Sequence, residues 1–350
     1  MKVLVTGGGG FLGTAICKIL ISKEYEVINF SRNSYPHLSE LGVKTHKGNL
    51  SDLESIRNAL SGVDAIFHVA AIAGVWGKYD TYYQTNTTGS QNIVTVAKEL
   101  GIKFLIYTST PSVVFGKNDI NNGDESLDYP NKYLTHYAYT KHLAEKYILN
   151  ACDEDFHAVA LRPHLIWGPN DPHILPRLID KARAGRLKRV GEGTNLVDII
   201  YVDNAAMAHV LAFEKLIKDQ SISSNAYFIG QEAPVSLWDF INKLIVLSGE
   251  EPIESSISFK KAYFIGGILE KVYSLLGINK PEPPMTRFIA TQLAKSHYFS
   301  HAKAKSHFGY EATITIDEGL KRTFAKRNEN LHLTKNITDM TSTNSDKTLL

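Results

Sequence analysis

Cysteine is scarce in this sequence: only Cys17 and Cys152 occur among 350 residues, with no metal-ligand spacing. This scarcity excludes a disulfide framework and a thiolate metal site, and it predicts reduced, buried side chains in a cytoplasmic protein. The 13 histidines form no metal motif either, because His136 and His142 are six residues apart and do not share a helix face. We therefore expect no metal ion.

Strong net charge and long apolar runs are also missing. The formal net charge is +2 at pH 7, which gives no electrostatic reason to expect nucleic acid as a partner. No uncharged apolar run reaches the roughly 18 residues of a membrane-spanning helix, and the apolar run 3–5 is too short for a secretion signal. A content of 43% hydrophobic and 21% charged residues instead predicts a soluble globular protein with a full core.

Short apolar segments alternate with segments of helical periodicity through the first half of the chain. The strand-like segments are apolar on both faces, as in a parallel sheet covered by helices; they are KVLVT, YEVINFS, VKTHKG, DAIFHVAA, KFLIYTS and HAVALRP. In the segment after the first strand, Phe11, Ile16, Ile19 and Leu20 share one helix face. The alternation predicts right-handed βαβ units and an α/β fold with a Rossmann-type, doubly wound parallel sheet.

The pattern loosens after about residue 163, where Pro, Gly and charge become more frequent. The segments 174–185 and 237–249 have helical spacing, and NAYFIG (225–230) and ATITI (312–316) are strand candidates. We interpret this part of the chain as a smaller α/β region that packs over one edge of the main sheet.

Two domains and a tail follow from this division. We predict an NADP-binding domain over 1–163, to which some later segments return, and a substrate-binding region over 164–326. The polar, unpatterned segment 327–350 is predicted to be a disordered tail.

Four consecutive glycines, Gly7 to Gly10, separate the first predicted strand from the first predicted helix. With Gly13 they form G-x-x-G-x-x-G, which is typical of a tight turn where the backbone approaches a pyrophosphate and the helix packs closely on the strand. Free N–H groups at the helix start, including those of Phe11 and Leu12, favour phosphate. The alternative is a flexible glycine turn without a ligand.

The end of the second predicted strand indicates which dinucleotide binds. NAD sites usually have an acidic residue there for the ribose 2′-hydroxyl, whereas this sequence has Ser31 and Arg32. A guanidinium suits a 2′-phosphate, so we expect NADPH rather than NADH. The alternative is that Arg32 is a solvated surface charge.

Two further segments belong to the same predicted cleft. Asn49 and Leu50 follow the third strand, where they would lie beside the adenine. Ala70 and Ala71 end the fourth strand, and their small side chains let a ribose lie against the backbone.

Tyr137 and Lys141 are four residues apart in HYAYTKHLAEKY, which places them on one helix face. An ammonium beside a phenol lowers a pKa that starts near ~10, and so makes the tyrosine a usable acid–base group. A plain surface pair is the alternative. Hydroxyl groups that could hold a substrate oxygen follow the fifth predicted strand: Thr108, Ser109, Thr110 and Ser112.

These motifs resemble the extended short-chain dehydrogenase/reductase superfamily over about residues 1–325. TGGGGFLG matches its TGxxGxxG fingerprint and YAYTK matches its YxxxK. The resemblance implies that Thr110, with Ser109 as the fallback, polarises the carbonyl. It also implies cofactor contacts by Asn86 in NTTGSQN and by Pro163 in LRPHLIWGP. Asn49 departs from the family's aspartate.

The resemblance extends to one branch of the superfamily. TSTPSVVFG followed by NNGDESLDYP resembles the 3β-hydroxysteroid and sterol-4-carboxylate dehydrogenases, and longer strings such as YTSTPSVVFG and ALRPHLIWGPNDPHILPRLIDK are similar to its members in bacterial long-chain olefin biosynthesis. The latter imply NADPH-dependent reduction of a β-keto acid, a 2-alkyl-3-oxoalkanoate, to the 2-alkyl-3-hydroxyalkanoate. The superfamily implies a homodimer through helices near 82–100 and 133–150, and the olefin branch implies association with other enzymes of that pathway.

Apolar residues support a lipid-like substrate. Val75 and Trp76 follow the fourth strand, beside the expected nicotinamide. The segment 262–278 is helix-like and could roof an apolar channel, lie on a membrane surface as part of a peripheral protein, or be an ordinary core helix. His164 is a candidate contact for the substrate, with a structural role as the alternative.

Three other functions stay open. A steroid or sterol 3β-dehydrogenase would use NAD, against which Arg32 argues. A nucleotide-sugar epimerase or dehydratase would need basic residues for a pyrophosphate, which KARAGRLKRVG could supply. An NADPH-binding protein without redox activity would be expected to lack the Tyr–Lys pair.

Overall fold

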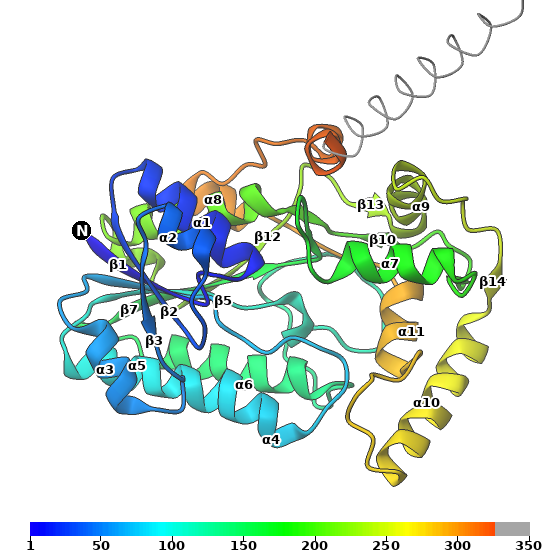
Figure 1. Cartoon of the computed structure of the whole chain (residues 1–350), viewed down its shortest axis with the longest axis horizontal. Coiled ribbons are helices and arrows are strands. Elements are labelled where there is room, and N and C mark those ends of the chain that lie inside the picture. Colours follow the sequence, from blue (N-terminus) through cyan, green and yellow to red (C-terminus); the bar gives the residue numbers. More distant parts are fainter. Residues whose placement is uncertain (326–350) are drawn as a thin grey trace, which may run out of the picture.

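Seven parallel strands form the main sheet of the protein, as the computed structural model shows for residues 1–325 (Figure 1). Their order is β12-β7-β5-β4-β1-β2-β3, so the chain runs outward from β1 to β3 and then crosses back to β4. This reversal confirms the predicted doubly wound sheet, and it places a ligand crevice at the carboxyl ends of β1 and β4. The strands are β1 (Lys2–Thr6), β2 (Glu26–Ser31), β3 (Lys44–Lys47), β4 (Ala65–His68), β5 (Phe104–Thr108), β7 (His157–Pro163) and β12 (Asn225–Ile229).

Both faces of the sheet are buried because successive strand residues point to opposite sides. In β1, Val3 and Val5 enter one apolar core while Leu4 enters the other. The first core lies under α1 (Phe11–Ser22), α2 (Pro36–Glu40), α8 (Val202–Leu216) and α12 (Ala302–Phe308). The second lies under α3 (Leu53–Leu60), α5 (Gly89–Glu99) and α6 (His136–Asn150), which run along the opposite face in Figure 1.

A second group of elements, on the right in Figure 1, has its own core around Trp167. The indole meets Tyr201 and Phe240 edge to face, with ring centroids 5.3 and 5.2 Å away. Its helices are α7 (Ile174–Arg183), α9 (Leu237–Leu247), α10 (Phe259–Leu275) and α11 (Arg287–Ala294).

Short strands connect this group. One sheet has the order β13 (Val235–Ser236), β10 (Leu196–Val197), β15 (His297–Phe299) and β6 (Ile120–Gly123). Two strand pairs complete it: β8 (Ile166–Trp167) with β11 (Ile200–Tyr201), and β9 (Arg189–Val190) with β14 (Ser256–Ile257). Between β4 and α5 lie α4 (Tyr79–Tyr82) and a π-helical turn, Tyr83–Thr88; short 3₁₀ turns span Pro111–Val113 and Gln220–Ile222.

Of the two strands predicted in the later part of the chain, one is confirmed as a strand but lies elsewhere, and the other is wrong. NAYFIG was expected in the smaller region, but its residues form β12 at the edge of the main sheet, paired in parallel with β7. ATITI is not a strand, because side chains take up its backbone groups. Ile314 N–H donates to Asn204 Oδ1 (3.1 Å), and its carbonyl accepts from Asn204 Nδ2 (2.7 Å).

The described residues also bear on several expected absences. Both cysteines are free; Cys17 is buried as expected, whereas Cys152 is only partly buried. Within residues 1–325 no cluster of His, Cys, Asp and Glu has the makeup of a metal site. No helix in that range is both long and apolar enough to cross a membrane. The predicted tail 327–350 lies outside the described residues.

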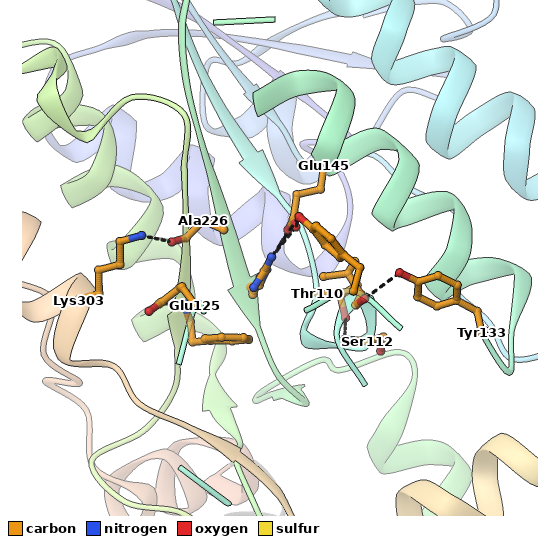
Figure 2. Close-up of polar contacts among 11 residues, drawn as sticks. Thr110, Ser112, Glu125, Tyr133, Glu145, Ala226 and Lys303 are labelled. Atoms are coloured by element: carbon orange, nitrogen blue, oxygen red, sulfur yellow. Dashed lines mark hydrogen bonds and ion pairs between the residues drawn. The ribbon is translucent and has the colours of Figure 1, made fainter. Parts of the chain in front are cut away.

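A buried ion pair joins α6 to β7 behind the cleft, and Figure 2 shows the contacts of Glu145 within it. Arg162 Nη2 is 2.6 Å from Glu145 Oε1, and Arg162 Nε donates to Oε2 at 3.0 Å. The Tyr129 hydroxyl also donates to Oε1, at 2.7 Å. Since the two charged side chains are 0% and 3% exposed, neither can turn to water if its partner is lost.

Replacing Glu145 by leucine should therefore lower the free energy of unfolding by about 3–5 kcal/mol, because it leaves the Arg162 guanidinium buried and unpaired. Urea unfolding followed by circular dichroism measures this. The double variant Glu145→Leu/Arg162→Met removes both charges and should regain most of the loss. A single variant as stable as the wild type would contradict this account of the pair.

Candidate active site

One cleft of about 670 Å³ follows the carboxyl ends of the central strands. It brings together nearly all residues that the sequence predicted. The predicted cofactor residues that line it are Gly7, Gly10, Phe11, Leu12, Gly13, Ser31, Arg32, Asn49, Leu50, Ala70, Ala71 and Pro163. Thr110, Tyr137, Lys141, Val75 and His164 line it as well. Asn86 and Trp76 do not.

Backbone atoms leave little or no room for a side chain at Gly7 and Gly13 of the glycine-rich turn. A Cβ on Gly13 would lie 2.2 Å from the carbonyl oxygen of Gly7, so only glycine lets α1 start so close to β1. Gly7 has φ +69°, and a Cβ there would lie 3.0 Å from the Cα of Ala70. Helix α1 then begins with no side-chain cap and no acidic residue in its first turn. Its free N–H groups fit the pyrophosphate of a dinucleotide.

The end of β2 carries a free cation at the cleft. Ser31 Oγ is engaged locally, since it donates to the Asn33 carbonyl (2.7 Å) and accepts from Asn29 Nδ2 (2.9 Å). Arg32 is exposed, lines the cleft, and joins no ion pair with any other residue in 1–325. Its guanidinium is therefore available to a ligand.

Lys141 is held inside the protein at the end of β5. Thr135 caps α6 by accepting from the Ala138 N–H at 3.2 Å, and one turn later Lys141 Nζ donates to the Thr108 carbonyl at 2.6 Å. The ammonium lies 4.1 Å from the centroid of the Tyr107 ring, and Lys141 is only 2% exposed. Burial lowers the pKa of Lys141 to about 7, although Glu145 opposes this change.

Tyr137 departs from the expectation for a Tyr–Lys pair. Its pKa is raised by burial, while the nearby Thr110 side chain acts in the opposite direction. The lowering of the Tyr137 pKa that we expected from the ammonium is absent. Lys141 is directed at the Thr108 carbonyl, and burial disfavours the charged phenolate. The phenol is thus held in its protonated form.

The hydroxyl groups after β5 have different partners. His209 Nδ1 donates to the Ala205 carbonyl (2.7 Å), so its Nε2 accepts from Thr108 Oγ1 at 2.8 Å. Thr110 Oγ1 accepts from the Ser112 N–H at 3.2 Å. The Thr110 side chain also acts on the Tyr137 phenol, so the two hydroxyl groups lie close together and can meet the same ligand oxygen.

A buried polar chain that sequence reasoning missed supports the floor of the cleft. Thr6 Oγ1 accepts the N–H groups of Val69 (3.1 Å) and Ala70 (3.0 Å), and so donates to His68 Nδ1 at 2.8 Å. His68 Nε2 then donates to Ser90 Oγ at 2.9 Å. Burial, and to a lesser extent Lys141, lowers the pKa of His68 to about 3, so the ring is neutral and its tautomer is set.

Asn86 completes this support rather than facing the cleft. Its side-chain Oδ1 accepts the Ile72 N–H at 2.8 Å, and its Nδ2 donates to the Ile72 carbonyl at 3.0 Å. Its backbone carbonyl accepts from Ser90 Oγ at 2.6 Å. The π-helical turn Tyr83–Thr88 places it there, a type of irregularity that is frequent at functional sites. Its polar sequence, NTTGSQN, was the signal available beforehand.

The far end of the cleft mixes predicted and unpredicted residues. His164 is buried with no partner for Nε2 among the described residues, and its ring packs edge to face on His297 at 4.7 Å. Burial and His297 hold its pKa well below the ordinary value, so it is neutral. Trp76 points elsewhere, with Nε1 donating to the Ile278 carbonyl at 2.8 Å. His173, which the sequence placed near the cofactor together with His164, lines the cleft as well. Lining residues that sequence reasoning missed include Arg177, Phe288 and Gln292.

Fold and cleft together define an oxidoreductase of the extended short-chain dehydrogenase/reductase class, which acts on CH–OH groups with a nicotinamide cofactor. Residues 4–260 match the 3-beta hydroxysteroid dehydrogenase/isomerase family, and the chain belongs to that family. The resemblance seen in the sequence is thereby confirmed.

Several relatives are similar over nearly their whole length. The 2-alkyl-3-oxoalkanoate reductase of Stenotrophomonas maltophilia is 44% identical over 324 residues, which cover 92% of this chain and 98% of that protein. The sterol-4-alpha-carboxylate 3-dehydrogenase, decarboxylating, of Mus musculus is 33% identical, covering 92% of this chain and 90% of that protein.

Among solved structures, the UDP-glucuronic acid 4-epimerase from Bacillus cereus in complex with NAD is similar with a TM-score of 0.70. It is 23% identical, covering 93% of this chain and 98% of that one. At this identity the likeness shows the fold alone.

The burial of Lys141 makes stability depend on pH. Its pKa falls from 10.5 to about 7 on folding, so between these values the unfolded chain binds a proton that the folded chain does not. The free energy of unfolding should then rise with pH by up to about 1.4 kcal/mol per unit, and the burial cost is fully present below pH 7.

Urea unfolding of wild type and Lys141→Met at pH of about 6, 7.5 and 9 tests this, because the difference cancels other titrations. The stability advantage of the methionine variant should be largest at the lowest pH and shrink as the pH rises. A difference independent of pH would show that Lys141 is charged in the folded state throughout.

Proposed function

We propose that this protein is an NADPH-dependent ketoreductase that converts a 2-alkyl-3-oxoalkanoate into the 2-alkyl-3-hydroxyalkanoate. The observation that carries the proposal is the charge of the cleft. Of the described residues that line it, none is Asp or Glu, and the cations are Arg32, Lys141 and Arg177. An anionic cofactor and an anionic substrate both suit such a cleft.

The order of the strands separates the three cations. Arg32 follows β2 on one side of the switch point, Lys141 reaches the end of β5, and Arg177 lies on α7, which follows β7 and β8 on the other side. We assign Arg32 to the 2′-phosphate of NADPH, because no acidic residue there selects a 2′-hydroxyl.

The catalytic roles follow from the hydrogen bonds that each side chain has left. Tyr137 stays protonated and delivers a proton to the oxygen at C3. Thr110, whose side chain lies beside the Tyr137 phenol, donates its hydroxyl proton to the same oxygen when the substrate is bound. Lys141 keeps at least one N–H group beyond its bond to Thr108 in either protonation state, and this suits a ribose hydroxyl. The bound cofactor supplies the hydride that C3 receives.

Arg177 is the group that we assign to the substrate carboxylate. Lys141 is buried and occupied, and His164 is neutral, so Arg177 is the cation left at this end of the cleft. Its side chain is 60% exposed and lies 3.3 Å from Glu282 Oε2, a partly exposed pairing that a substrate carboxylate can replace. Val75, Ile174 and Phe288 line the same end and suit an alkyl chain.

The wider setting follows from the same proposal. Residues 164–326 would supply most of the substrate side, and the helices around α5 and α6 would form a homodimer interface. The β-hydroxy acid product suits a cytoplasmic step of long-chain olefin biosynthesis in which a partner enzyme takes it up.

Nucleotide sugars are a poorer match. The basic cluster that kept this alternative open includes Arg183, which pairs with Glu250 at 2.7 Å, and none of its residues lines the cleft. Sterol oxidation stays the second candidate, because sterol dehydrogenases are among the relatives.

The direct test follows nicotinamide absorbance with a long-chain 2-alkyl-3-hydroxy acid plus NADP⁺ and, in parallel, dehydroepiandrosterone plus NAD⁺. Turnover of the hydroxy acid alone is expected, with Tyr137→Phe as the inactive control. Arg177→Gln should raise KM for the acid and lower kcat/KM about 10- to 100-fold, since it removes a charge-assisted hydrogen bond. The kcat/KM for the methyl ester of the same acid should not change in Arg177→Gln.

Arg186→Gln is the matched control, because Arg186 is exposed and outside the cleft. If Arg177→Gln lowers kcat/KM equally for the acid and the ester, Arg177 does not bind the carboxylate, but the proposed ketoreductase activity still holds. Turnover of the steroid alone would overturn the proposed substrate.

Arg32→Ala tests the cofactor assignment separately. The ratio of kcat/KM with NADPH to that with NADH should fall about 10- to 100-fold, because the 2′-phosphate loses its counter-charge. Lys44→Ala, an exposed cation on β3 outside the cleft, should leave the ratio unchanged. A variant that keeps its preference for NADPH would show that Arg32 is only a surface charge.

A further inference from the structure

Helix α10 exposes an unusual amount of apolar surface. Its outward side chains include Phe264 (69% exposed), Ile268 (46%), Val272 (43%) and Leu275 (88%), and Leu276 (64%) follows the helix. Spacings of four, four and three residues place the helical members on one face, and we call these five residues the α10 stripe. Figure 1 shows α10 at the edge of the molecule, beside α11.

The opposite face of α10 is already in use. Ala262 and Gly266 are buried, and a Cβ on Gly266 would lie 2.6 Å from the carbonyl carbon of Thr286. Glu270 accepts the backbone N–H of Arg287 at 2.7 Å and its Nε at 2.6 Å. The helix is therefore fixed by its inner face, and rotation cannot hide the α10 stripe.

The exposed charged residues on α10 are all lysines. Lys260, Lys261 and Lys271 are exposed on the helix, and Lys280 is exposed just beyond it. Lys271 comes three residues after Ile268 and four before Leu275, so it shares their face. Glu270 is the single acidic residue between positions 259 and 281, and Arg287 neutralises it.

We propose that α10 is a lipid-binding helix that lies on an anionic membrane surface. The α10 stripe enters the boundary between headgroups and acyl chains, while the lysines extend to lipid phosphates. A second copy of the chain fits this face less well, because a two-fold contact would set the same lysines against each other. Lysine is also depleted from the cores of protein interfaces.

Contacts through Trp76 link α10 to the rim of the cleft. Ile278, just after the helix, accepts from Trp76 Nε1 at 2.8 Å, and the Trp76 ring meets Tyr273 of α10 at 6.2 Å. The neighbours of Trp76 in sequence, Gly74 and Val75, line the cleft. If the substrate is the lipid-like acid proposed above, it can pass from the bilayer to the cleft along this rim.

Co-sedimentation with vesicles tests the proposal without any substrate, and so independently of the proposed function. Full-length protein should bind vesicles with about one quarter phosphatidylglycerol more strongly than pure phosphatidylcholine, and added salt should weaken the binding. The variant Phe264→Ser/Leu275→Ser should lose at least about 10-fold in partitioning, because each apolar side chain carries ~1.5–3 kcal/mol of burial. Lys260→Gln/Lys271→Gln should lose mainly the preference for anionic vesicles.

The matched control is Leu53→Ser/Val246→Ser, which removes two side chains that are 42% and 52% exposed on α3 and α9. It should bind vesicles like the wild type. Thermal unfolding checks that each variant is folded.

Wild-type protein that stays in the supernatant with anionic vesicles would overturn the proposal. Light scattering after size exclusion tests the alternative, in which a second copy of the chain covers the α10 stripe. A dimer that Phe264→Ser/Leu275→Ser makes monomeric, together with no vesicle binding, would assign the α10 stripe to a second copy instead.

Discussion

The buried face of α6 is the constraint on which the site depends. Tyr137, Lys141 and Glu145 follow one another at four-residue intervals on one face. Tyr137 lines the cleft, whereas Lys141 and Glu145 are buried, so each of these two needs a partner inside the protein. Lys141 donates to the Thr108 carbonyl and lies over the Tyr107 ring, and Glu145 forms an ion pair with Arg162. The ion pair at Glu145 fixes the helix against β7, and this placement sets where the phenol and the ammonium reach the cleft.

Backbone geometry prepares the other half of the cleft. The bare turn at Gly7 and Gly13 brings α1 close to β1, and the chain from Thr6 through His68 to Ser90 holds the Ala70 backbone beside it. These groups satisfy one another and leave few polar atoms free. The N–H groups at the start of α1 have no side-chain cap and stay available to a ligand, which is how a site is preorganised.

The fold alone does not select a reaction. The same sheet is shared with a nucleotide-sugar epimerase at a TM-score of 0.70, so the chemistry depends on the side chains at the strand ends. Here Arg177 and Arg32 stand at opposite ends of a cleft that, in the described chain, has no acidic lining residue. Helix α10 differs between its two faces: the outer face is apolar and basic, as the proposed membrane contact requires, while the inner face packs on α11.

The sequence by itself determined the first six strands of the sheet, the glycine-rich turn and the Tyr–Lys pair, because these depend on local periodicity and on spacings within one element. It also contained Glu145 at the next four-residue step after Lys141, but its buried partner Arg162 lies on another element and could not be inferred from spacing. Only the tertiary structure decided that NAYFIG joins the main sheet, that Asn86 holds the Ile72 backbone, and that Arg177 reaches the cleft. The tertiary structure also decided the pKa values of Tyr137 and Lys141. All of these features depend on which segments meet in space and on how much water those segments exclude. Neither of these two factors can be read from the order of neighbouring residues.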